Sequence, residues 1–249
     1  MGDVVGVVLA GGEATRLDEL TRITNKHLLP VGRFPMVYHP LMKLEEAGID
    51  EICLVTGQSH AGDFIDVLGD GEVVDRSGKK IIDVKLTYKV QKKSGGIAEA
   101  LGLTKHFAGN SRVVVILGDN IIGCSIKPNV DAFRRQKRGA RVLLKKVKDP
   151  WRFGVVEIEG SKIVNINEKP QKPKSNLIQI GVYMYDSSIF DIISKLKPSA
   201  RGEIEITDAN MHYVKNNEME FDILKCWWTD AGTFDSLMDA NKLAFSEGV

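Results

Sequence analysis

The chain has 249 residues, 43% hydrophobic and 27% charged, which is ordinary for a globular protein long enough to bury a core. The formal net charge of +1 provides no global field for binding nucleic acid or a membrane surface. No run approaches the ~18 apolar residues that span a bilayer, and no basic segment precedes an apolar one at the N-terminus, so we expect a cytoplasmic protein.

The first predicted element is an apolar strand over Val4–Ala10, which runs into a glycine-rich turn. Gly11 and Gly12 allow the backbone to turn tightly and to present N–H groups to phosphate oxygens. Arg16 and Lys26 supply positive charge beyond that turn. The spacing matches neither the G-x-G-x-x-G dinucleotide fingerprint nor a phosphate loop ending in Gly-Lys-Ser/Thr. The pattern therefore indicates nucleotide handling and disfavours a dehydrogenase.

Strands and helices alternate through the rest of the first half. The predicted strands are Ile52–Thr56, Val84–Val90 and Val113–Leu117, and the predicted helices are Met36–Ala47, Ala61–Leu68 and Ile97–Phe107. Apolar strands separated by helices indicate a parallel sheet covered on both faces, whose ligands lie beyond the carboxyl ends of the strands. Gly11-Gly12, Gln91 and Gly118-Asp119 all follow such ends.

The second half contains strands with short connections, followed by helices. The strands are predicted at Arg141–Val147, Gly154–Ile158, Ile163–Asn167 and Ile178–Tyr185, and the helices at Ser188–Leu196, Ile206–Val214 and Phe234–Phe245. The chain shows no repeat and no long linker. We predict an α/β protein with a Rossmann-like, mostly parallel mixed sheet flanked by helices, in a single domain over residues 1–249.

Two isolated carboxylates, Asp119 and Asp230, follow apolar segments. Each could simply cap the helix that follows it. Alternatively, the pair suits Mg²⁺, which takes one or two protein carboxylates together with waters and substrate phosphates. The sequence also leaves two roles possible for Gln91. It could be an ordinary surface residue, or its amide could pair with the imide edge of thymine or uracil.

Other charged and sulfur-containing residues carry less information. The basic run Arg134–Arg138 is expected to be a solvated helix face, because no aromatic residues are interleaved with it. Cys53, Cys124 and Cys226 are odd in number and widely spaced, which argues against a disulfide framework or a structural zinc site. Their spacing fits a reducing compartment.

Several motifs together resemble the sugar nucleotidyltransferases, specifically the glucose-1-phosphate thymidylyltransferases, from Gly6 to about Ala244. The motifs are Leu9-Ala10-Gly11-Gly12-x-x-Thr15-Arg16-Leu17, Lys26-x-Leu28-Leu29-Pro30, Gln91 with Gly96-Ile97-Ala98, Gly118-Asp119, Glu168-Lys169-Pro170, Ala200-Arg201-Gly202-Glu203-x-Glu205-Ile206-Thr207-Asp208 and Trp228-x-Asp230-x-Gly232-Thr233. The resemblance implies a nucleotide-binding half over about 1–140 and a sugar-binding half over about 141–249. It also implies a homo-oligomer that binds neither nucleic acid nor a membrane.

The resemblance also implies roles for individual residues. The nucleotide would be bound by Gly11, Gly12, Thr15, Arg16, Lys26, Gln91, Gly96 and Asp119, and the sugar phosphate by Asn120, Gly154, Glu168, Lys169 and Arg201. Asp119 and Asp230 would hold Mg²⁺, and the catalytic set would be Arg16, Lys26, Asp119, Lys169 and Asp230. Glu203 and Glu205 would orient neighbouring groups or have a structural role. His27 stands where longer relatives usually carry glutamine, and it could contact the nucleotide.

The sequence departs from the family pattern in two places. Glu13 and Ala14 occupy positions where the family has glycine-rich backbone, which adds a negative charge and a methyl group close to the expected phosphates. Ile180 precedes Gly181, where the family usually has threonine. The chain resembles the short members of the family, which lack the C-terminal helices of an allosteric site.

The resemblance implies transfer of a thymidylyl group from dTTP to α-D-glucose 1-phosphate, giving dTDP-glucose and pyrophosphate with Mg²⁺. Two alternatives stay open. A related enzyme could use UTP or another hexose 1-phosphate, because Gln91 cannot read the thymine methyl group. Glu13 and Ala14 leave room for a non-catalytic sensor of nucleotides or nucleotide sugars.

Overall fold

The computed structural model describes residues 4–12 and 15–247, without the side chains of Thr15, Arg16, Asp18 and Glu247. These residues divide into two compact units, each assembled from segments that lie far apart in the sequence. Unit 1 comprises the N-terminal residues up to Val4, Gly95–Val115 and Asn129–Lys225. Unit 2 comprises Val5–Ser94, Ile116–Pro128 and the residues from Cys226 on.

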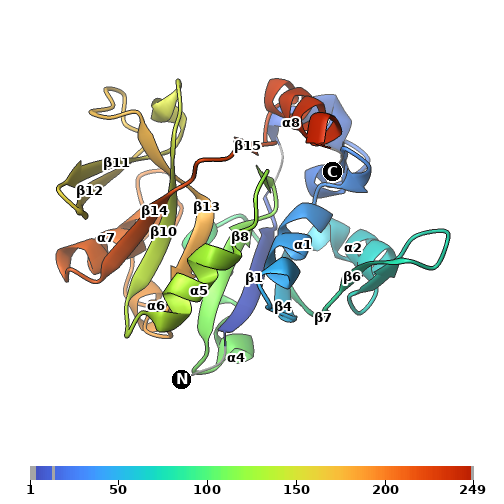
Figure 1. The fold of residues 1–249 in the computed structure, drawn as a ribbon, viewed down its shortest axis with the longest axis horizontal. Helices are drawn as coiled ribbons and strands as arrows, with labels where there is room; N and C mark the ends of the chain where they lie inside the picture. The colour runs from blue at the N-terminus through green and yellow to red at the C-terminus, as the bar shows by residue number, and fades with distance from the viewer. Residues whose placement is uncertain (1–3, 13–14, 248–249) are drawn as a thin grey trace. The chain divides into compact units, whose positions relative to one another are not determined.

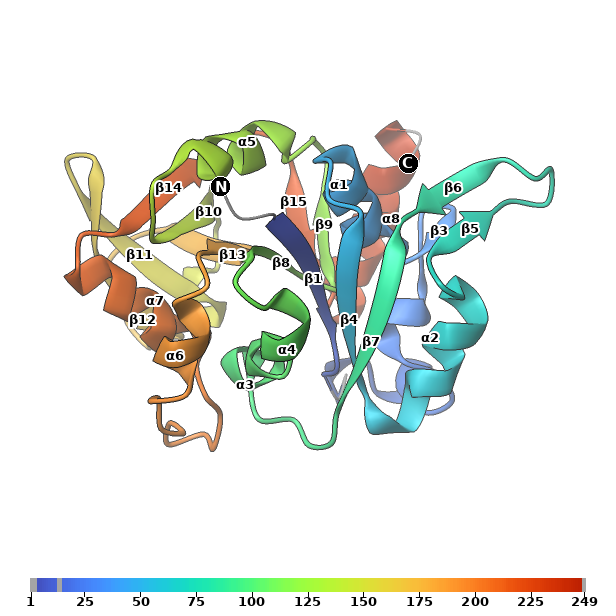
Figure 2. The ribbon, with the colours of Figure 1, turned by 90° about the horizontal axis from the view of Figure 1, so that it is seen from below.

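Unit 2 is built on parallel strands. β4 (Glu51–Gly57) lies between β1 (Val4–Ala10) and β7 (Lys85–Gln91), as Figure 2 shows. β1 and β4 are nearly continuous runs of buried apolar residues, as expected for parallel strands covered on both faces. Helices α1 (Tyr38–Glu46) and α2 (Ala61–Leu68) lie in the connections between them. Because the three strands point the same way, their carboxyl ends share one edge.

Short ladders and 3-10 helices complete unit 2. The ladders pair β2 (Pro30–Val31) with β3 (Phe34–Pro35), β5 (Glu72–Val74) with β6 (Lys80–Asp83), and β9 (Asn120–Ile122) with β15 (Trp228–Asp230). The 3-10 helices are η1 (Thr15–Thr21), η2 (Lys26–Leu28) and η3 (Gln58–His60). The C-terminal helix α8 (Phe234–Glu247) packs against β15 and β2 through a cluster that includes Leu237 and Ala240.

A disulfide joins Cys124 to Cys226, with 6.0 Å between their Cα atoms, so the expectation that the cysteines form no disulfide is wrong. The two are 102 positions apart, but antiparallel pairing of β9 with β15 brings them together just beyond one end of the ladder. The third cysteine, Cys53, is buried in β4, and burial raises the pKa of its thiol to about 11. The argument for a reducing compartment from cysteine usage therefore loses its basis.

Unit 1 is built around β13 (Leu177–Tyr185), in which all nine residues are buried. β13 pairs antiparallel with β10 (Ala140–Lys146) and with β11 (Gly154–Glu159), and β11 continues through a tight turn into β12 (Lys162–Glu168). Gly160 provides the positive φ of 60° that this turn needs. β14 (Met219–Ile223) pairs parallel with β10.

Helix α7 (Ile206–Lys215) packs against β12 and β14 in unit 1, as Figure 1 shows. The remaining elements of this part of the chain are α3 (Ile97–Gly102), α4 (Lys105–Ala108), β8 (Arg112–Leu117), α5 (Lys127–Arg135), η4 (Pro150–Arg152) and α6 (Ile189–Ile193). β8 ends and α5 begins in unit 2, since the division falls within both elements.

The predicted α/β class is confirmed, with parallel pairing in unit 2 and mixed pairing in unit 1. The predicted helix over Ile97–Phe107 is instead two helices, because buried Thr104 turns its hydroxyl back to the Leu101 carbonyl at 2.7 Å. The basic run is a helix face only in part, since α5 ends at Arg135.

Across residues 4–12 and 15–247, no helix combines the length and the apolar character needed to cross a bilayer.

Candidate active site

A cleft of about 810 Å³ lies in unit 2 at the shared carboxyl edge of β1, β4 and β7. It is lined by Gly11 and Gly12 after β1, by Gly57 at the end of β4 and by Gln91 at the end of β7. The structure thus brings together the predicted glycine turn and the predicted base-reading amide. This is the edge at which open parallel sheets bind ligands.

Gly11 and Gln91 are in close contact inside this cleft. A Cβ on Gly11 would lie 2.9 Å from Gln91 Oε1, so a larger residue there would displace the Gln91 amide. Gly12 differs, because a Cβ there would meet nothing within 4 Å. The Gln91 side chain is buried, and its amide is held against the glycine turn.

The cleft also contains residues that the sequence did not single out. They follow β4 and β7 or precede η2, and include Gln58, Ser59, His60, Arg22, Lys92 and Lys93. Their place in the sequence could have identified them, because polar residues directly after a buried parallel strand lie at the ligand-binding edge. Arg22, Lys92 and Lys93 give the cleft a local positive charge in a chain of net charge +1.

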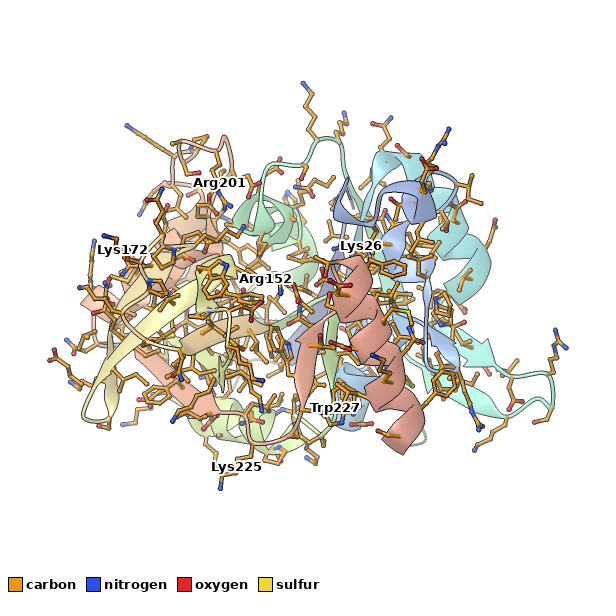
Figure 3. All side chains as sticks on the ribbon, turned by 90° about the horizontal axis from the view of Figure 1, so that it is seen from above. Lys26, Arg152, Lys172, Arg201, Lys225 and Trp227 are labelled. Atoms are coloured by element: carbon orange, nitrogen blue, oxygen red, sulfur yellow. A yellow bond between two sulfur atoms is a disulfide. The ribbon has the colours of Figure 1, made fainter. Side chains whose placement is uncertain are left out.

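Lys26 and Asp119 form a buried ion pair in unit 2, with 2.5 Å between Nζ and Oδ2 and side-chain exposures of 10% and 14%. Lys26, labelled in Figure 3, begins η2, whose N-cap Asn25 accepts from the His27 backbone N–H. The second carboxylate oxygen of Asp119 accepts from Asn120 Nδ2 at 3.0 Å. Burial alone would raise the pKa of Asp119, but Lys26 and Asn120 outweigh it and hold the pKa below the ordinary value.

His27 is enclosed beside this pair rather than exposed in the cleft. Its ring Nδ1 lies 2.7 Å from Asn25 Oδ1, and a Cβ on Gly118 would lie 2.6 Å from its ring carbon Cδ2. Burial, followed by the charge of Lys26, lowers the pKa of His27 to about 3. The ring is therefore neutral at physiological pH.

Asp230 is brought to the same end of the β9–β15 ladder as Asp119. Asp230 pairs in register with Asn120, and the Ala231 N–H donates to the Asp119 carbonyl at 2.8 Å. Trp228 donates its indole N–H to Asn120 Oδ1 at 2.7 Å, so Asn120 is fixed on both sides of its amide. Asn120, predicted to bind sugar phosphate, is buried here. The adjacent tryptophan, Trp227, labelled in Figure 3, packs on the cluster beneath α8.

The chemistry of these groups fits Mg²⁺. Asp119, directly before β9, and Asp230, at the end of β15, offer hard oxygen donors, and each carboxylate oxygen has more than one lone pair. Over the part of the chain that is described, no three His, Cys, Asp or Glu side chains cluster as a cage. Two carboxylates suit an ion that keeps several waters and is completed by substrate phosphates.

Glu13 and Ala14 lie outside the described residues, as do the side chains of Thr15 and Arg16, of which only the backbone in η1 is described. The proposed roles of Thr15 and Arg16 toward phosphate therefore remain predictions.

Apart from Asn120, the predicted sugar-phosphate residues lie in unit 1, where Glu168 ends β12 and Lys169 follows it. Glu168 Oε1 is 3.6 Å from Lys169 Nζ and 3.5 Å from Arg201 Nη2. Arg201, on the loop before α7 in Figure 3, is held more tightly by Glu205, with distances of 2.7 and 2.8 Å from Nη2. Glu205 therefore orients Arg201, which is one of the two roles that the sequence left open for Glu203 and Glu205.

Lys169 has a φ of 42°, an unusual conformation for a non-glycine residue, especially directly before a proline. Its N–H donates to the Phe153 carbonyl at 3.0 Å, which helps to hold this backbone in place. Backbone strain of this kind is common at functional sites. The strained backbone at Lys169 is consistent with the functional role at phosphate that the sequence predicted for this residue.

The two predicted glycines of unit 1 are explained by packing. Gly154 pairs in register with Glu168, and a Cβ on Gly154 would lie 2.6 Å from Gln179 Nε2. Gly96 has a φ of 97°, and a Cβ there would lie 2.7 Å from the Ile204 carbonyl oxygen. Gly96 therefore requires glycine even without a ligand, and a larger residue at Gly154 would displace the Gln179 side chain.

Known proteins resemble this chain in sequence and in fold. A glucose-1-phosphate thymidylyltransferase of Neisseria meningitidis is 41% identical over 239 residues, covering 94% of this chain and 80% of that relative. A Bacillus anthracis crystal structure, provisionally assigned as the same enzyme and solved with sucrose, is 51% identical, with a TM-score of 0.89 over 97% and 95% of the two chains. A UDP-glucose pyrophosphorylase solved with UDP-glucose is 24% identical and similar in fold, with a TM-score of 0.86 over 99% and 100% of the chains.

Residues 5–247 match the family model described as nucleotidyl transferase, which is nearly the whole chain. With 41% identity to a thymidylyltransferase over 94% of the sequence, this assigns the chain without reliance on any single motif. The chain belongs to the nucleotidyl transferase family.

Proposed function

We propose that the protein transfers a thymidylyl group from dTTP to α-D-glucose 1-phosphate, giving dTDP-glucose and pyrophosphate. The observation that carries the proposal is the 41% identity to a glucose-1-phosphate thymidylyltransferase over 94% of this chain. The cleft with Gln91 at its strand edge and the buried Lys26–Asp119 pair beside the β9–β15 ladder support it. Glu168, Lys169 and Arg201 supply groups suited to a sugar and its phosphate.

The reaction is a displacement at the α-phosphorus of dTTP. A phosphate oxygen of glucose 1-phosphate forms the new P–O bond, and the bond to the β-phosphate bridging oxygen breaks, so pyrophosphate leaves with that electron pair. The nucleophile is already an anion, and no general base is needed. The protein's contribution is positioning and neutralisation of charge. Lys26 and Arg16 would stabilise the leaving pyrophosphate, and Lys169 and Arg201 would hold the sugar phosphate.

Asp119 and Asp230 would hold Mg²⁺ in the working enzyme. When bound, the ion would neutralise negative charge on the nucleotide phosphates. Lys26 donates to Asp119 Oδ2, so its ammonium would lie beside the same phosphates. Removal of divalent ions with EDTA is expected to abolish pyrophosphate release, and added Mg²⁺ to restore it.

The direct test measures pyrophosphate release from dTTP, UTP and CTP with glucose 1-phosphate. We expect kcat/KM to be highest with dTTP. A higher value with UTP would favour a uridylyltransferase, because the imide edge that Gln91 can read is common to thymine and uracil. A panel of other hexose 1-phosphates tests the sugar in the same way. Absence of pyrophosphate with every pair would favour the sensor.

Asp119→Asn tests the role of the buried pair. We expect kcat to fall by about a hundredfold or more, because the carboxylate that would hold Mg²⁺ and that pairs with Lys26 is lost. Asp239→Asn, at an exposed carboxylate on α8, is the matched control and should retain full turnover. Circular dichroism spectra would verify that both variants are folded. Near-normal turnover of Asp119→Asn would refute the assignment.

Three expectations belong to the same proposal. They are a homo-oligomeric assembly, a cytoplasmic location and a single domain with a nucleotide half and a sugar half. Light scattering of the purified protein would measure the first. The second no longer draws support from cysteine usage, because Cys124 and Cys226 are bonded.

A further inference from the structure

Glu168 is held by a partly buried hydrogen bond that the proposed reaction does not use. Thr207, in the first turn of α7, donates its hydroxyl to Glu168 Oε2 at 2.6 Å. Thr207 is 3% exposed, whereas the Glu168 side chain is 26% exposed. One carboxylate oxygen is thus tied to the protein interior, and the other, Oε1, faces Lys169 and Arg201.

The bond to Glu168 is the last of a chain of hydrogen bonds that runs through the core of unit 1. Gln179 Nε2 donates to Thr207 Oγ1 at 3.0 Å, and Asn210 Nδ2 donates to Gln179 Oε1 at 2.7 Å. The Tyr185 hydroxyl donates to Asn210 Oδ1 at 2.6 Å. Gln179, Asn210 and Tyr185 are 4%, 0% and 0% exposed. We call the four residues of this chain, Tyr185, Asn210, Gln179 and Thr207, the Glu168 relay.

The relay has a direction, because an amide donates only from its nitrogen and accepts only at its oxygen. Burial raises the pKa of Tyr185, so its hydroxyl stays protonated and can donate to Asn210. The amide nitrogen of Asn210 must then donate to the Gln179 oxygen. The amide nitrogen of Gln179 must in turn donate to the Thr207 hydroxyl. The Thr207 oxygen is thereby occupied as an acceptor, and its proton is directed to Glu168. Each member fixes the orientation of the next.

Gly154 makes room for this arrangement. A Cβ at Gly154 would lie 2.6 Å from Gln179 Nε2 and 3.0 Å from its Cδ and Cγ, so a larger residue would displace the Gln179 amide. Gly154 also lies opposite Glu168 in the β11–β12 register. The glycine and the carboxylate of the predicted sugar site are therefore linked through Gln179.

We infer that Thr207, Gln179 and Asn210 are positioning residues for sugar-phosphate binding, which hold the Glu168 carboxylate with Oε2 in the core and Oε1 available to hydroxyl groups of a hexose 1-phosphate. This inference rests on the proposed function, since it assigns Glu168 to the sugar. The relay acts on recognition of the sugar phosphate and leaves nucleotide binding unchanged.

Thr207→Val and Thr207→Ser form a matched pair for the test. Valine keeps the shape of threonine and removes the hydroxyl, while serine keeps the hydroxyl. We expect Thr207→Val to raise the KM for glucose 1-phosphate about tenfold, as for loss of a hydrogen bond to a charged group, with the KM for dTTP within twofold of wild type. Thr207→Ser should behave like wild type. Gln179→Met, one step back along the relay, should raise the same KM in the same direction.

A purely structural role gives a different pattern. In that case Thr207→Val would lower the melting temperature and change both KM values together, or would leave both unchanged, and either result would overturn the inference. Calorimetric titration with glucose 1-phosphate alone separates this failure from failure of the proposed function. If the wild type binds the sugar phosphate but forms no pyrophosphate, the proposed function fails, and the affinities of the Thr207 pair still decide the inference.

Discussion

Lys26 and Asp119 stand 93 positions apart in the sequence, yet their charged groups are buried against each other. Motifs in the sequence predicted that both are functional, because a lysine after a glycine turn and a carboxylate after a buried strand each suit phosphate and metal. The ion pair itself could not be predicted. It depends on how η2 and the end of β8 fold together, and no local pattern encodes that distance.

The Glu168 relay illustrates the same limit at individual residues. Glu168 was predicted from its motif, but Gln179 and Asn210 carry no local signal, because each reads as one polar residue within an otherwise ordinary strand or helix. Their importance follows from burial, since a buried amide needs partners at both ends. Only the tertiary structure shows that those partners lead to Glu168.

His27 should make stability depend on pH. The ring has a pKa of about 3 in the folded protein and about 6.5 when unfolded, so the unfolded state binds more protons between these values. The free energy of unfolding is therefore retained above pH 6.5 and falls as the pH drops toward 3, by about 1.4 kcal/mol per pH unit. His27→Gln, which removes this titration, should flatten the pH dependence by about that slope.

Urea denaturation followed by circular dichroism at pH 4 to 7 would measure this slope. His60→Gln, at a ring on the edge of the cleft, controls for the loss of one histidine. Parallel curves for wild type and His27→Gln over this range would show that the buried ring does not titrate as expected.

At the scale of elements, long apolar runs could be predicted and short ladders could not. β1 and α2 coincide with their predicted ranges, because a continuous buried run and a helical period each extend over several residues. β9 and β15 have three residues apiece, too few to show a period. Yet this ladder determines where Asp119 and Asp230 lie, so the most important element of the site was the least visible in the sequence.

The Cys124–Cys226 disulfide should stabilise that ladder. It closes a loop of about a hundred residues, and such cross-links typically contribute about 2–4 kcal/mol by restricting the unfolded chain. Cys226→Ser is expected to lower the free energy of unfolding by this amount, measured by urea denaturation without reductant. Dithiothreitol should lower the stability of the wild type equally and have no effect on the variant. Equal stability of the oxidised wild type and the variant would mean that the cross-link adds nothing.

At the scale of the whole molecule, the sequence predicted the α/β class and the carboxyl edge of the parallel strands as the site. It did not predict that each compact unit is assembled from interleaved segments. Strand and helix patterns are local, whereas the return of the chain from Cys226 onward into unit 2 depends on long-range packing of α8 on β2 and β15. Asp230 therefore comes close to Asp119 through this long-range return of the chain, which local sequence patterns do not predict.

The division of the described residues into two units leads to a prediction about the two substrates. If dTTP binds at the glycine turn and Gln91, its addition should slow backbone hydrogen exchange at Gly57–His60 and Gln91–Ser94, which line the cleft of unit 2. Glucose 1-phosphate, added alone, should instead protect Glu168–Lys169 and the loop with Arg201 in unit 1, because ligand binding lowers the population of locally open states. Exchange measured by mass spectrometry with each substrate separately avoids turnover, and inorganic phosphate controls for the phosphate group alone. Protection of the same segments by both substrates, or protection by phosphate equal to that by the sugar phosphate, would contradict the assignment of nucleotide and sugar to different units.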